Sequence, residues 1–162
     1  MTDAAPTSVT LRLAKPEDCL LYWEWANCPD VRSMAFHSTS IPWEAHVKWF
    51  TSRLNSAKSF LFVMEDKSQI PVGQVRFDEC EEGVFEIDLS VASNRRGHGL
   101  GKELLSLGES MLRRCKDIRT LRASVLSTNA ASLALFLAAG YEVSGRIQGH
   151  KGKPAMALQK NI

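Results

Sequence analysis

Residues 94–105 read NRRGHGLGKELL, which places two arginines before three glycines at alternate positions and then starts a helical pattern. Glycine lets the backbone turn sharply, or lie against a ligand with no Cβ in between. A helix that begins here adds unpaired N–H groups and the positive end of its dipole, and both suit an anion such as phosphate. The stretch with Gly97, Gly99 and Gly101 therefore predicts a phosphate-binding loop.

The spacing of this loop excludes two common phosphate-binding motifs. A P-loop requires Ser or Thr after its lysine, and Lys102 is followed by Glu103. A dinucleotide-binding fingerprint requires a third glycine where Lys102 stands, within a parallel βαβ unit, whereas the segment before the loop reads as an antiparallel meander. A tight turn whose glycines serve geometry alone stays open, but such a turn needs only one or two glycines and no flanking arginines.

Hydrophobic periodicity predicts strands and helices on both sides of the loop. The helix after it has an apolar stripe of residues three or four apart, namely Leu100, Leu104, Leu107, Met111 and Cys115. Three further helices are expected, from Pro16 to about Asn27, from Pro42 onward, and from the cap Asn129 to Ala139. The strands expected are 9–13, 59–65, 71–79, 84–91, 120–126, 141–147 and 155–160.

Composition and charge narrow the class of protein. With 162 residues and 44% hydrophobic content, the chain can bury one sizeable core, so we expect one domain over residues 9–162 after a flexible segment at 1–8. The formal net charge of +2 is too balanced to indicate a nucleic-acid partner. The sequence has no run of about 18 apolar residues, no signal-peptide pattern and no C-x-x-C pair. We therefore expect a cytoplasmic protein with reduced thiols, no membrane partner and no metal.

Two motifs in a fixed order point to a family. The pattern Arg-Gly-x-Gly-x-Gly at 96–101 follows a strand and precedes an amphipathic helix, and NAASLALFLAAGY at 129–141 follows as a capped helix. Together they resemble the GNAT superfamily of acyl-CoA-dependent N-acyltransferases, and the resemblance covers nearly the whole chain. It implies an α/β (α+β) fold with a mixed central sheet of about seven strands flanked by about four helices. It also implies acetyl-CoA (coenzyme A) as cofactor.

The resemblance gives the loop its ligand, the pyrophosphate of coenzyme A, held by backbone N–H groups with added charge from Arg95, Arg96 or Lys102. It places the end of the 84–91 strand beside the pantetheine arm and the helix after Asn129 on the other side. Asn129 also serves as a helix cap. The cofactor-binding residues that it implies are Leu89, Ser90, Val91, Arg96, Gly97, His98, Gly99, Leu100, Gly101, Lys102, Asn129, Ser132 and Phe136.

Acyl transfer to an amine needs a neutral amine, a stabilised oxyanion and a proton for the departing thiolate. Glu86 and Asp88 alternate with apolar residues, so both carboxylates point away from the core, and the resemblance places their strand beside the acceptor cleft. We expect both as candidates for the catalytic base, although a solvated strand face fits the pattern equally well. His150 and water-mediated deprotonation stay open, and an N–H near Val91 is the oxyanion donor that the resemblance implies.

One position departs from the family. Many members carry a tyrosine seven residues after the asparagine that corresponds to Asn129, whereas this chain has Phe136, which cannot protonate a thiolate. Ser132, a water molecule or the acceptor's own ammonium are alternatives, and Tyr141 is disfavoured because it is expected in the core. The departure favours, as an alternative of another class, a non-catalytic acyl-CoA-binding module.

Residues 23–50, WEWANCPDVRSMAFHSTSIPWEAHVKWF, resemble the GNAT branch that acetylates nucleotide-linked amino sugars in pseudaminic acid and related bacterial surface-sugar pathways. They also resemble the branch that acetylates protein N-termini, so a peptide or ribosomal-protein amine is the alternative acceptor. The partners expected are a small-molecule amine, with a UDP-sugar as one candidate, and a second copy of the chain if a homodimer forms. The acceptor-binding residues expected are Trp25, Asn27, Arg32, His46 and His150, although the aromatic residues also fit a core stripe.

Overall fold

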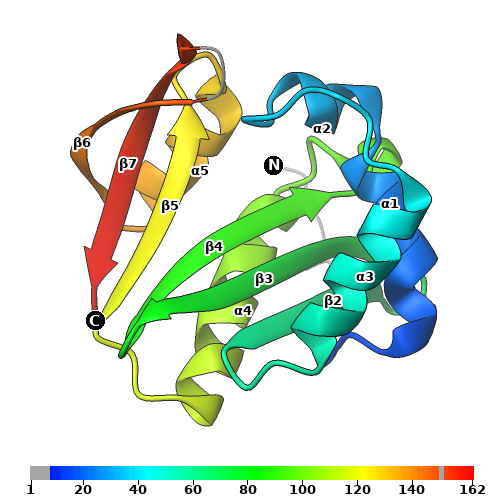
Figure 1. The fold of residues 1–162 in the computed structure, drawn as a ribbon. Coiled ribbons are helices and arrows are strands. Elements are labelled where there is room, and N and C mark those ends of the chain that lie inside the picture. The colour runs from blue at the N-terminus through cyan, green and yellow to red at the C-terminus, as the bar shows by residue number, and fades with distance from the viewer. Residues whose placement is uncertain (1–7, 150–151) are drawn as a thin grey trace, which may run out of the picture.

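The computed structural model describes residues 8–149 and 152–162, which form a seven-stranded mixed sheet covered by helices on both faces (Figure 1). The strands lie in the order β1-β2-β3-β4-β5-β7-β6. They are β1 (Val9–Leu13), β2 (Ser59–Asp66), β3 (Pro71–Glu81), β4 (Val84–Val91), β5 (Thr120–Leu126), β6 (Glu142–Gln148) and β7 (Pro154–Asn161). Within the described residues, four helices have eight residues or more, α1 (Cys19–Ala26), α3 (Trp43–Leu54), α4 (Leu100–Cys115) and α5 (Ala130–Ala138). The predicted fold class is confirmed.

The predicted element bounds agree with the structure except between the first two predicted helices. There Pro29 opens a short helix, α2 (Pro29–Ser33), in a stretch where the sequence pattern predicts only a helix end. Proline at the first helical position has no N–H to lose and a suitable φ, so it can begin a helix as readily as it ends one. Two 3₁₀ turns, η1 (Pro16–Asp18) and η2 (Ser93–Arg95), complete the described elements. In the described part of the chain, no helix is long and apolar enough to span a membrane.

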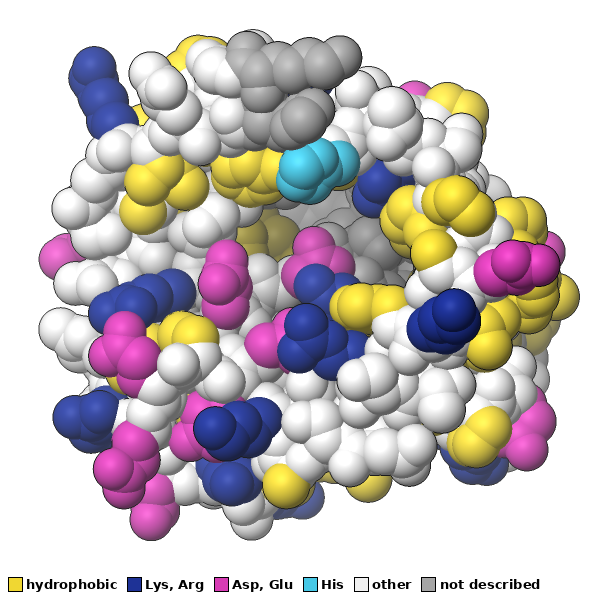
Figure 2. Space-filling view, in the orientation of Figure 1, with side chains coloured by type: hydrophobic (Ala, Val, Ile, Leu, Met, Phe, Trp, Pro, Cys, Tyr) yellow, Lys and Arg dark blue, Asp and Glu magenta, His cyan; other side chains and the backbone are white. Residues whose placement is uncertain are grey.

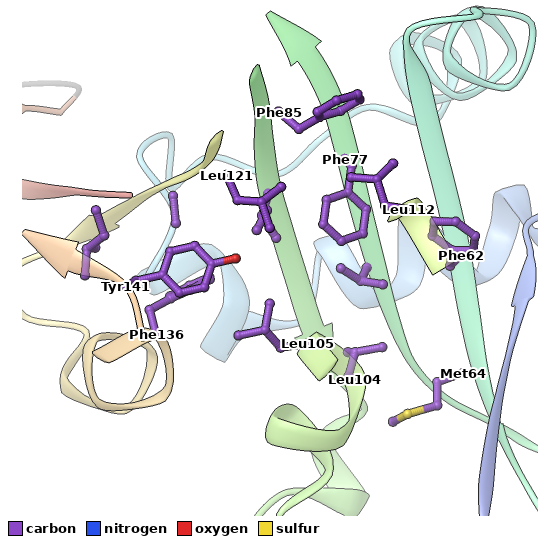
Figure 3. Close-up of a cluster of buried hydrophobic side chains, with 14 of the residues drawn as sticks. Phe62, Met64, Phe77, Phe85, Leu104, Leu105, Leu112, Leu121, Phe136 and Tyr141 are labelled. Atoms are coloured by element: carbon purple, nitrogen blue, oxygen red, sulfur yellow. The ribbon is translucent and has the colours of Figure 1, made fainter. Parts of the chain in front are cut away.

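The main core lies between the sheet and α4, whose buried leucines at 100, 104, 105 and 112 pack toward β3 and β4. Of the predicted stripe, Leu107 and Met111 are only half-buried and Cys115 is exposed, so the buried face is rotated from the predicted one. Figure 3 shows Phe62, Phe77 and Leu112 directed toward one another in this layer. The packing is close enough that a Cβ added at Gly108 would lie 3.0 Å from a methyl group of Val75. On the opposite face, Tyr22 of α1 packs in a second cluster and donates a hydrogen bond from its hydroxyl to the Phe62 carbonyl at 2.8 Å.

A buried polar network fixes the C-terminal half to α4. The Tyr141 hydroxyl donates to Glu109 Oε1 at 2.8 Å, and Lys160 Nζ donates to Glu109 Oε2 at 3.0 Å. Burial, and then the neighbouring Glu109 carboxylate, raise the pKa of Tyr141 above its ordinary value. Tyr141 is 2% exposed and belongs to the core, as its Gly-aromatic position predicts.

The sheet divides between β4 and β5. The two strands pair in parallel only over Val84–Glu86 and Thr120–Arg122 and then diverge toward α2 (Figure 1). The second half of β4 therefore has β3 on one side, and no strand of the described residues pairs with its other side. Backbone groups on that open side are available to a ligand, because a sheet edge leaves N–H and C=O groups unpaired.

Candidate active site

A cavity of about 1120 Å³ lies where β4 and β5 diverge. Figure 2 shows this face of the molecule hollowed, with acidic and basic side chains gathered along one edge of the hollow. We call one part of its lining the polar cluster, which consists of Gln74, Arg76 and Asp88. We call another part the loop wall, which consists of Arg95, Arg96, Gly97, Gly99, Leu100, Gly101 and Lys102.

The loop wall offers backbone N–H groups. Gly97 and Gly99 have φ angles of 80° and 75°, in the left-handed region that glycine adopts without strain. A Cβ added at either glycine would meet no atom of a described residue within 4 Å, so these residues leave the space beside both glycines open. The N–H groups of residues 96–102 hydrogen-bond to no other residue that the structure describes. Since α4 begins at Leu100, its positive end adds to an arrangement suited to a phosphate-sized anion.

Carboxylates on neighbouring elements hold both loop arginines. Arg95 Nη1 lies 3.0 Å from Asp66 Oδ2, and Arg96 Nη1 lies 3.1 Å from Asp30 Oδ2 on α2. The Asp30 side chain is 74% exposed, so the second ion pair is weak and can exchange for an anionic ligand. Lys102 lines the cavity, whereas His98 is exposed and is not part of the lining.

The remaining predicted cofactor residues form two facing sides of the cavity. Leu89, Ser90 and Val91 line it from the open edge of β4. On the other side the Asn129 side chain caps α5, accepting a hydrogen bond from Ser132 N–H at 3.3 Å. Phe136 follows on the same helix, 4% exposed, with its ring edge-on to Tyr141 at 5.0 Å between centroids. These side chains leave a slot between β4 and α5.

The two carboxylates expected as base candidates occupy different places. Asp88 lines the cavity and accepts a hydrogen bond from Gln74 Nε2 at 3.2 Å. Glu86 lies at the last paired position of β4 and β5, where Ser124 Oγ donates to its carboxylate at 3.4 Å, and it is not part of the lining. Only Asp88 can therefore meet a ligand in the cavity without a rearrangement.

Two of the predicted acceptor residues, Arg32 and Asn27, anchor the chain segment between α2 and α3 through hydrogen bonds to its backbone. Arg32 donates to the carbonyl oxygens of Ala26, His37 and Thr39, although its side chain also lines the cavity. Burial lowers the pKa of Arg32, and the nearby Asp88 carboxylate offsets part of this effect. Asn27 donates from Nδ2 to the carbonyl of Ile41 and accepts from its N–H, and it lies outside the lining.

The other predicted acceptor residues are Trp25, His46 and His150. Trp25 lines the cavity. His46 also lines it but is 3% exposed, with Nε2 lying 2.8 Å from the Cys19 carbonyl and its ring stacked on that of Phe50. Burial lowers the pKa of His46, and the contact with the Cys19 carbonyl offsets part of this effect. His150 lies outside the described residues.

The sequence reasoning missed the two β3 members of the polar cluster. Gln74 and Arg76 pair across the strands with Ser90 and Asp88, so all four side chains lie on one face. The signal was present, because polar residues at 74, 76 and 78 alternate with apolar ones along β3. Gln74 is 6% exposed, and its Oε1 accepts no hydrogen bond from any described residue. In the described ranges, no group of three or more His, Cys, Asp or Glu residues could hold a metal ion.

A protein family model and solved structures both resemble this chain. A family model described as an acetyltransferase (GNAT) domain matches residues 8–142. A ribosomal-protein-alanine N-acetyltransferase from Brucella melitensis has a similar structure, with 26% identity, a TM-score of 0.78, and coverage of 94% of this chain and 99% of that one. No curated protein matches the sequence.

Two more distant structures share the fold. A spermidine N-acetyltransferase from Vibrio cholerae, solved with coenzyme A and spermine, has 15% identity and a TM-score of 0.85, covering 94% of this chain and 95% of that one. An aminoglycoside acetyltransferase in complex with coenzyme A has 20% identity and a TM-score of 0.78, covering 95% of each chain. None of these three proteins is described as acting on a nucleotide-linked sugar, so the comparisons do not support that predicted branch.

Proposed function

This chain belongs to the GNAT acetyltransferase family and is an acetyl-CoA-dependent N-acetyltransferase, and from that premise we propose that one cavity brings its two substrates together. The loop wall takes acetyl-CoA, and the polar cluster takes the primary amine that accepts the acetyl group. The observation that carries the proposal is that a phosphate-suited loop and a cavity-lining carboxylate, Asp88, share the lining of this cavity.

The residues present fit acetyl-CoA. The open space beside Gly97 and Gly99 admits a pyrophosphate to the unpaired N–H groups of the loop wall. The unpaired edge of β4 at Leu89–Val91 suits the amide groups of a pantetheine arm, which can add to a sheet edge as a strand does. Phe136 lines the far side of the slot. When bound there, acetyl-CoA supplies an activated acetyl thioester.

Asp88 is the group that we assign to prepare the amine. An alkylammonium ion is unreactive until it loses a proton, and a carboxylate within reach can accept or relay that proton. Gln74 Nε2 donates to Asp88 Oδ2 at 3.2 Å, which fixes the orientation of the carboxylate. Phe136 offers no hydroxyl, so the thiolate must take its proton from water, from Ser132 or from the acceptor.

Two acceptors are proposed for the amine. The pattern at 23–50 favours an amino sugar linked to a nucleotide, and the Brucella melitensis enzyme favours a peptide with a free N-terminal amine. The structure argues against the predicted role of Arg32 as a ligand of a sugar nucleotide, because Arg32 already donates hydrogen bonds to the backbone carbonyls of Ala26 and His37. A homodimer stays a prediction.

The test is acetyl transfer from acetyl-CoA to a panel of amines, with acetyl-CoA affinity measured separately by calorimetry. The panel contains UDP-linked amino sugars, neutral amino sugars, amino acids, polyamines and peptides with N-terminal alanine. We expect micromolar acetyl-CoA binding and turnover with at least one primary amine. Acetyl-CoA binding without turnover of any panel member would oppose the assignment of the polar cluster as an amine site.

A further inference from the structure

We propose that Arg76 selects acceptors that carry an anionic group, a carboxylate or a phosphate, within a few bonds of the reacting amine. The inference rests on the proposed function, because it assigns Asp88 to the amine and Arg76 to the neighbouring anion. It goes beyond that function by naming the chemical class of the acceptor, and it ranks a peptide with N-terminal alanine, which has no anion near its amine, below an acceptor that carries a carboxylate or phosphate there.

The Arg76 guanidinium is held rigidly in the cavity lining. It lies over the Trp49 ring at 4.8 Å from the ring centroid, and its Nε donates to Asp78 Oδ2 at 2.8 Å. Contact with the face of an aromatic ring and one charge-assisted hydrogen bond restrict the position of a guanidinium before any ligand binds. A preorganised cation loses little conformational freedom on binding an anion, which favours affinity.

Arg76 also keeps donors for a ligand. Among the described residues, only its Nε makes a hydrogen bond within the protein, so the N–H groups on both Nη atoms remain available. Nη1 lies 3.8 Å from Asp88 Oδ2, which is an ion pair beyond hydrogen-bonding distance. Burial lowers the pKa of Arg76, but Asp88 and Asp78 outweigh it, so the pKa stays above its ordinary value and the cation is permanent.

The carboxylate behind Arg76 does not neutralise it fully. Asp78 is shared, because it also lies 3.4 Å from Arg53 Nη1 and accepts a hydrogen bond from Ser59 Oγ at 2.7 Å. In the cavity lining near the polar cluster, the two positive charges of Arg32 and Arg76 outnumber the one negative charge of Asp88. A polyamine or another polycation would meet net repulsion there, whereas an acceptor with one ammonium and one anion would pair with both signs.

The short distance between the two charged groups narrows the class further. Since Arg76 Nη1 and Asp88 Oδ2 are 3.8 Å apart, one compact acceptor can reach both. An amino acid, with its amine and carboxylate on one carbon, has this arrangement, and so does a small amine with a phosphate nearby. Arginine suits both anions, because its planar fork donates two parallel hydrogen bonds to carboxylate or phosphate oxygens.

The experiment compares matched acceptors that differ only in the anion. One arm pairs an α-amino acid with its uncharged carboxamide, and the other pairs an amino sugar phosphate with the neutral amino sugar; spermine serves as the polycation. Each is tested with the native protein and with Arg76→Met, which keeps the stack on Trp49 but removes the charge. Arg53→Met is the matched control, because Arg53 contacts the same Asp78 and does not line the cavity.

We expect the native protein to favour the anionic member of at least one pair by about tenfold or more in kcat/KM, as the loss of a charge-assisted hydrogen bond implies. Arg76→Met should bring that ratio near one while the KM for acetyl-CoA stays unchanged, and Arg53→Met should keep the ratio. Arg76→Lys should keep part of it, which guards against a variant that fails to fold.

Other outcomes overturn the inference. Equal rates with both members of each pair, a preference for spermine, or an anion preference that survives in Arg76→Met would each exclude Arg76 as the selector. If no amine is acetylated, calorimetry with carboxylates and phosphate esters that lack the amine decides: weaker binding in Arg76→Met supports the anion subsite, and equal binding refutes it. A failure to acetylate any amine would count against the proposed function, separately from this inference.

Discussion

The loop wall and the polar cluster line one cavity, but they are built in different ways. The loop wall comes from one short stretch of sequence, Arg95 to Lys102 without His98, and it presents mainly backbone N–H groups. The polar cluster combines side chains from two strands that meet through antiparallel pairing, with Arg76 opposite Asp88. A backbone site depends on glycine geometry and tolerates side-chain changes, whereas a side-chain site depends on each functional group and its partners.

The largest effect is expected where the backbone itself is altered. Gly99 has φ 75°, so valine there would be strained and would force the loop away from its present path. Several charge-assisted hydrogen bonds to a pyrophosphate would be lost together, and we expect acetyl-CoA affinity to fall by about 100-fold or more. Calorimetry on the folded Gly99→Val variant measures this loss.

Gly145→Val is the matched control for that substitution. Gly145 lies on β6, has no positive φ, and offers open space to an added Cβ. The Gly145→Val variant should therefore bind acetyl-CoA as the native protein does. An unchanged affinity in Gly99→Val would show that the loop wall does not hold the cofactor through its backbone, and the contrast with the polar cluster would disappear.

An intermediate effect is expected in the polar cluster. Asp88→Asn keeps the shape and the contact with Gln74 but removes the proton acceptor, so kcat should fall by about 100-fold at pH values where the amine is protonated. The difference from the native protein should narrow at high pH, where the amine is already neutral. Glu86→Gln should lower kcat by no more than about threefold, since Glu86 lies outside the cavity lining and general acid–base effects require contact.

The pH–rate profiles of the two variants, recorded with the best amine of the panel, check this prediction. Equal losses in both variants would mean that the polar cluster and the paired end of β4 act alike, which the structure does not suggest. A loss confined to Glu86→Gln would move the chemistry away from Asp88 altogether. The same profiles separate a lost proton acceptor, which depends on pH, from a distorted site, which does not.

The contrast also explains what the sequence could predict. The loop residues are adjacent, so a local pattern of glycines and arginines was enough to predict their place beside the helix start at Leu100, and hydrophobic periodicity predicted the sheet. The partners of Asp88 come from β3, and no local pattern shows that Arg76 stacks on Trp49 of α3. Arg32 and Asn27 anchor the segment before α3 by hydrogen bonds to its backbone. Only the fold brings those backbone groups within reach.

The smallest effect is expected at Phe136, where the sequence departs from its family. Phe136 lines the cavity and is 4% exposed, so a hydroxyl added by Phe136→Tyr meets either the cavity or the core around Tyr141. If it faces the cavity it can protonate the departing thiolate, and kcat should stay within about threefold of the native value or rise by up to about tenfold, because a thiolate leaves readily without an acid.

If the hydroxyl of Phe136→Tyr instead faces the core, the variant would bury an unpaired polar group at a cost of about 1–3 kcal/mol, and its melting temperature would fall. Measuring kcat and the melting temperature together therefore locates the new hydroxyl. Since Glu109 already accepts from both Tyr141 and Lys160, the core offers that hydroxyl no ready partner, and we expect an unchanged melting temperature with preserved turnover. A loss of kcat by more than about tenfold at an unchanged melting temperature would show that the slot between β4 and α5 has no room for an oxygen atom, and that a bare phenyl ring is what this position requires.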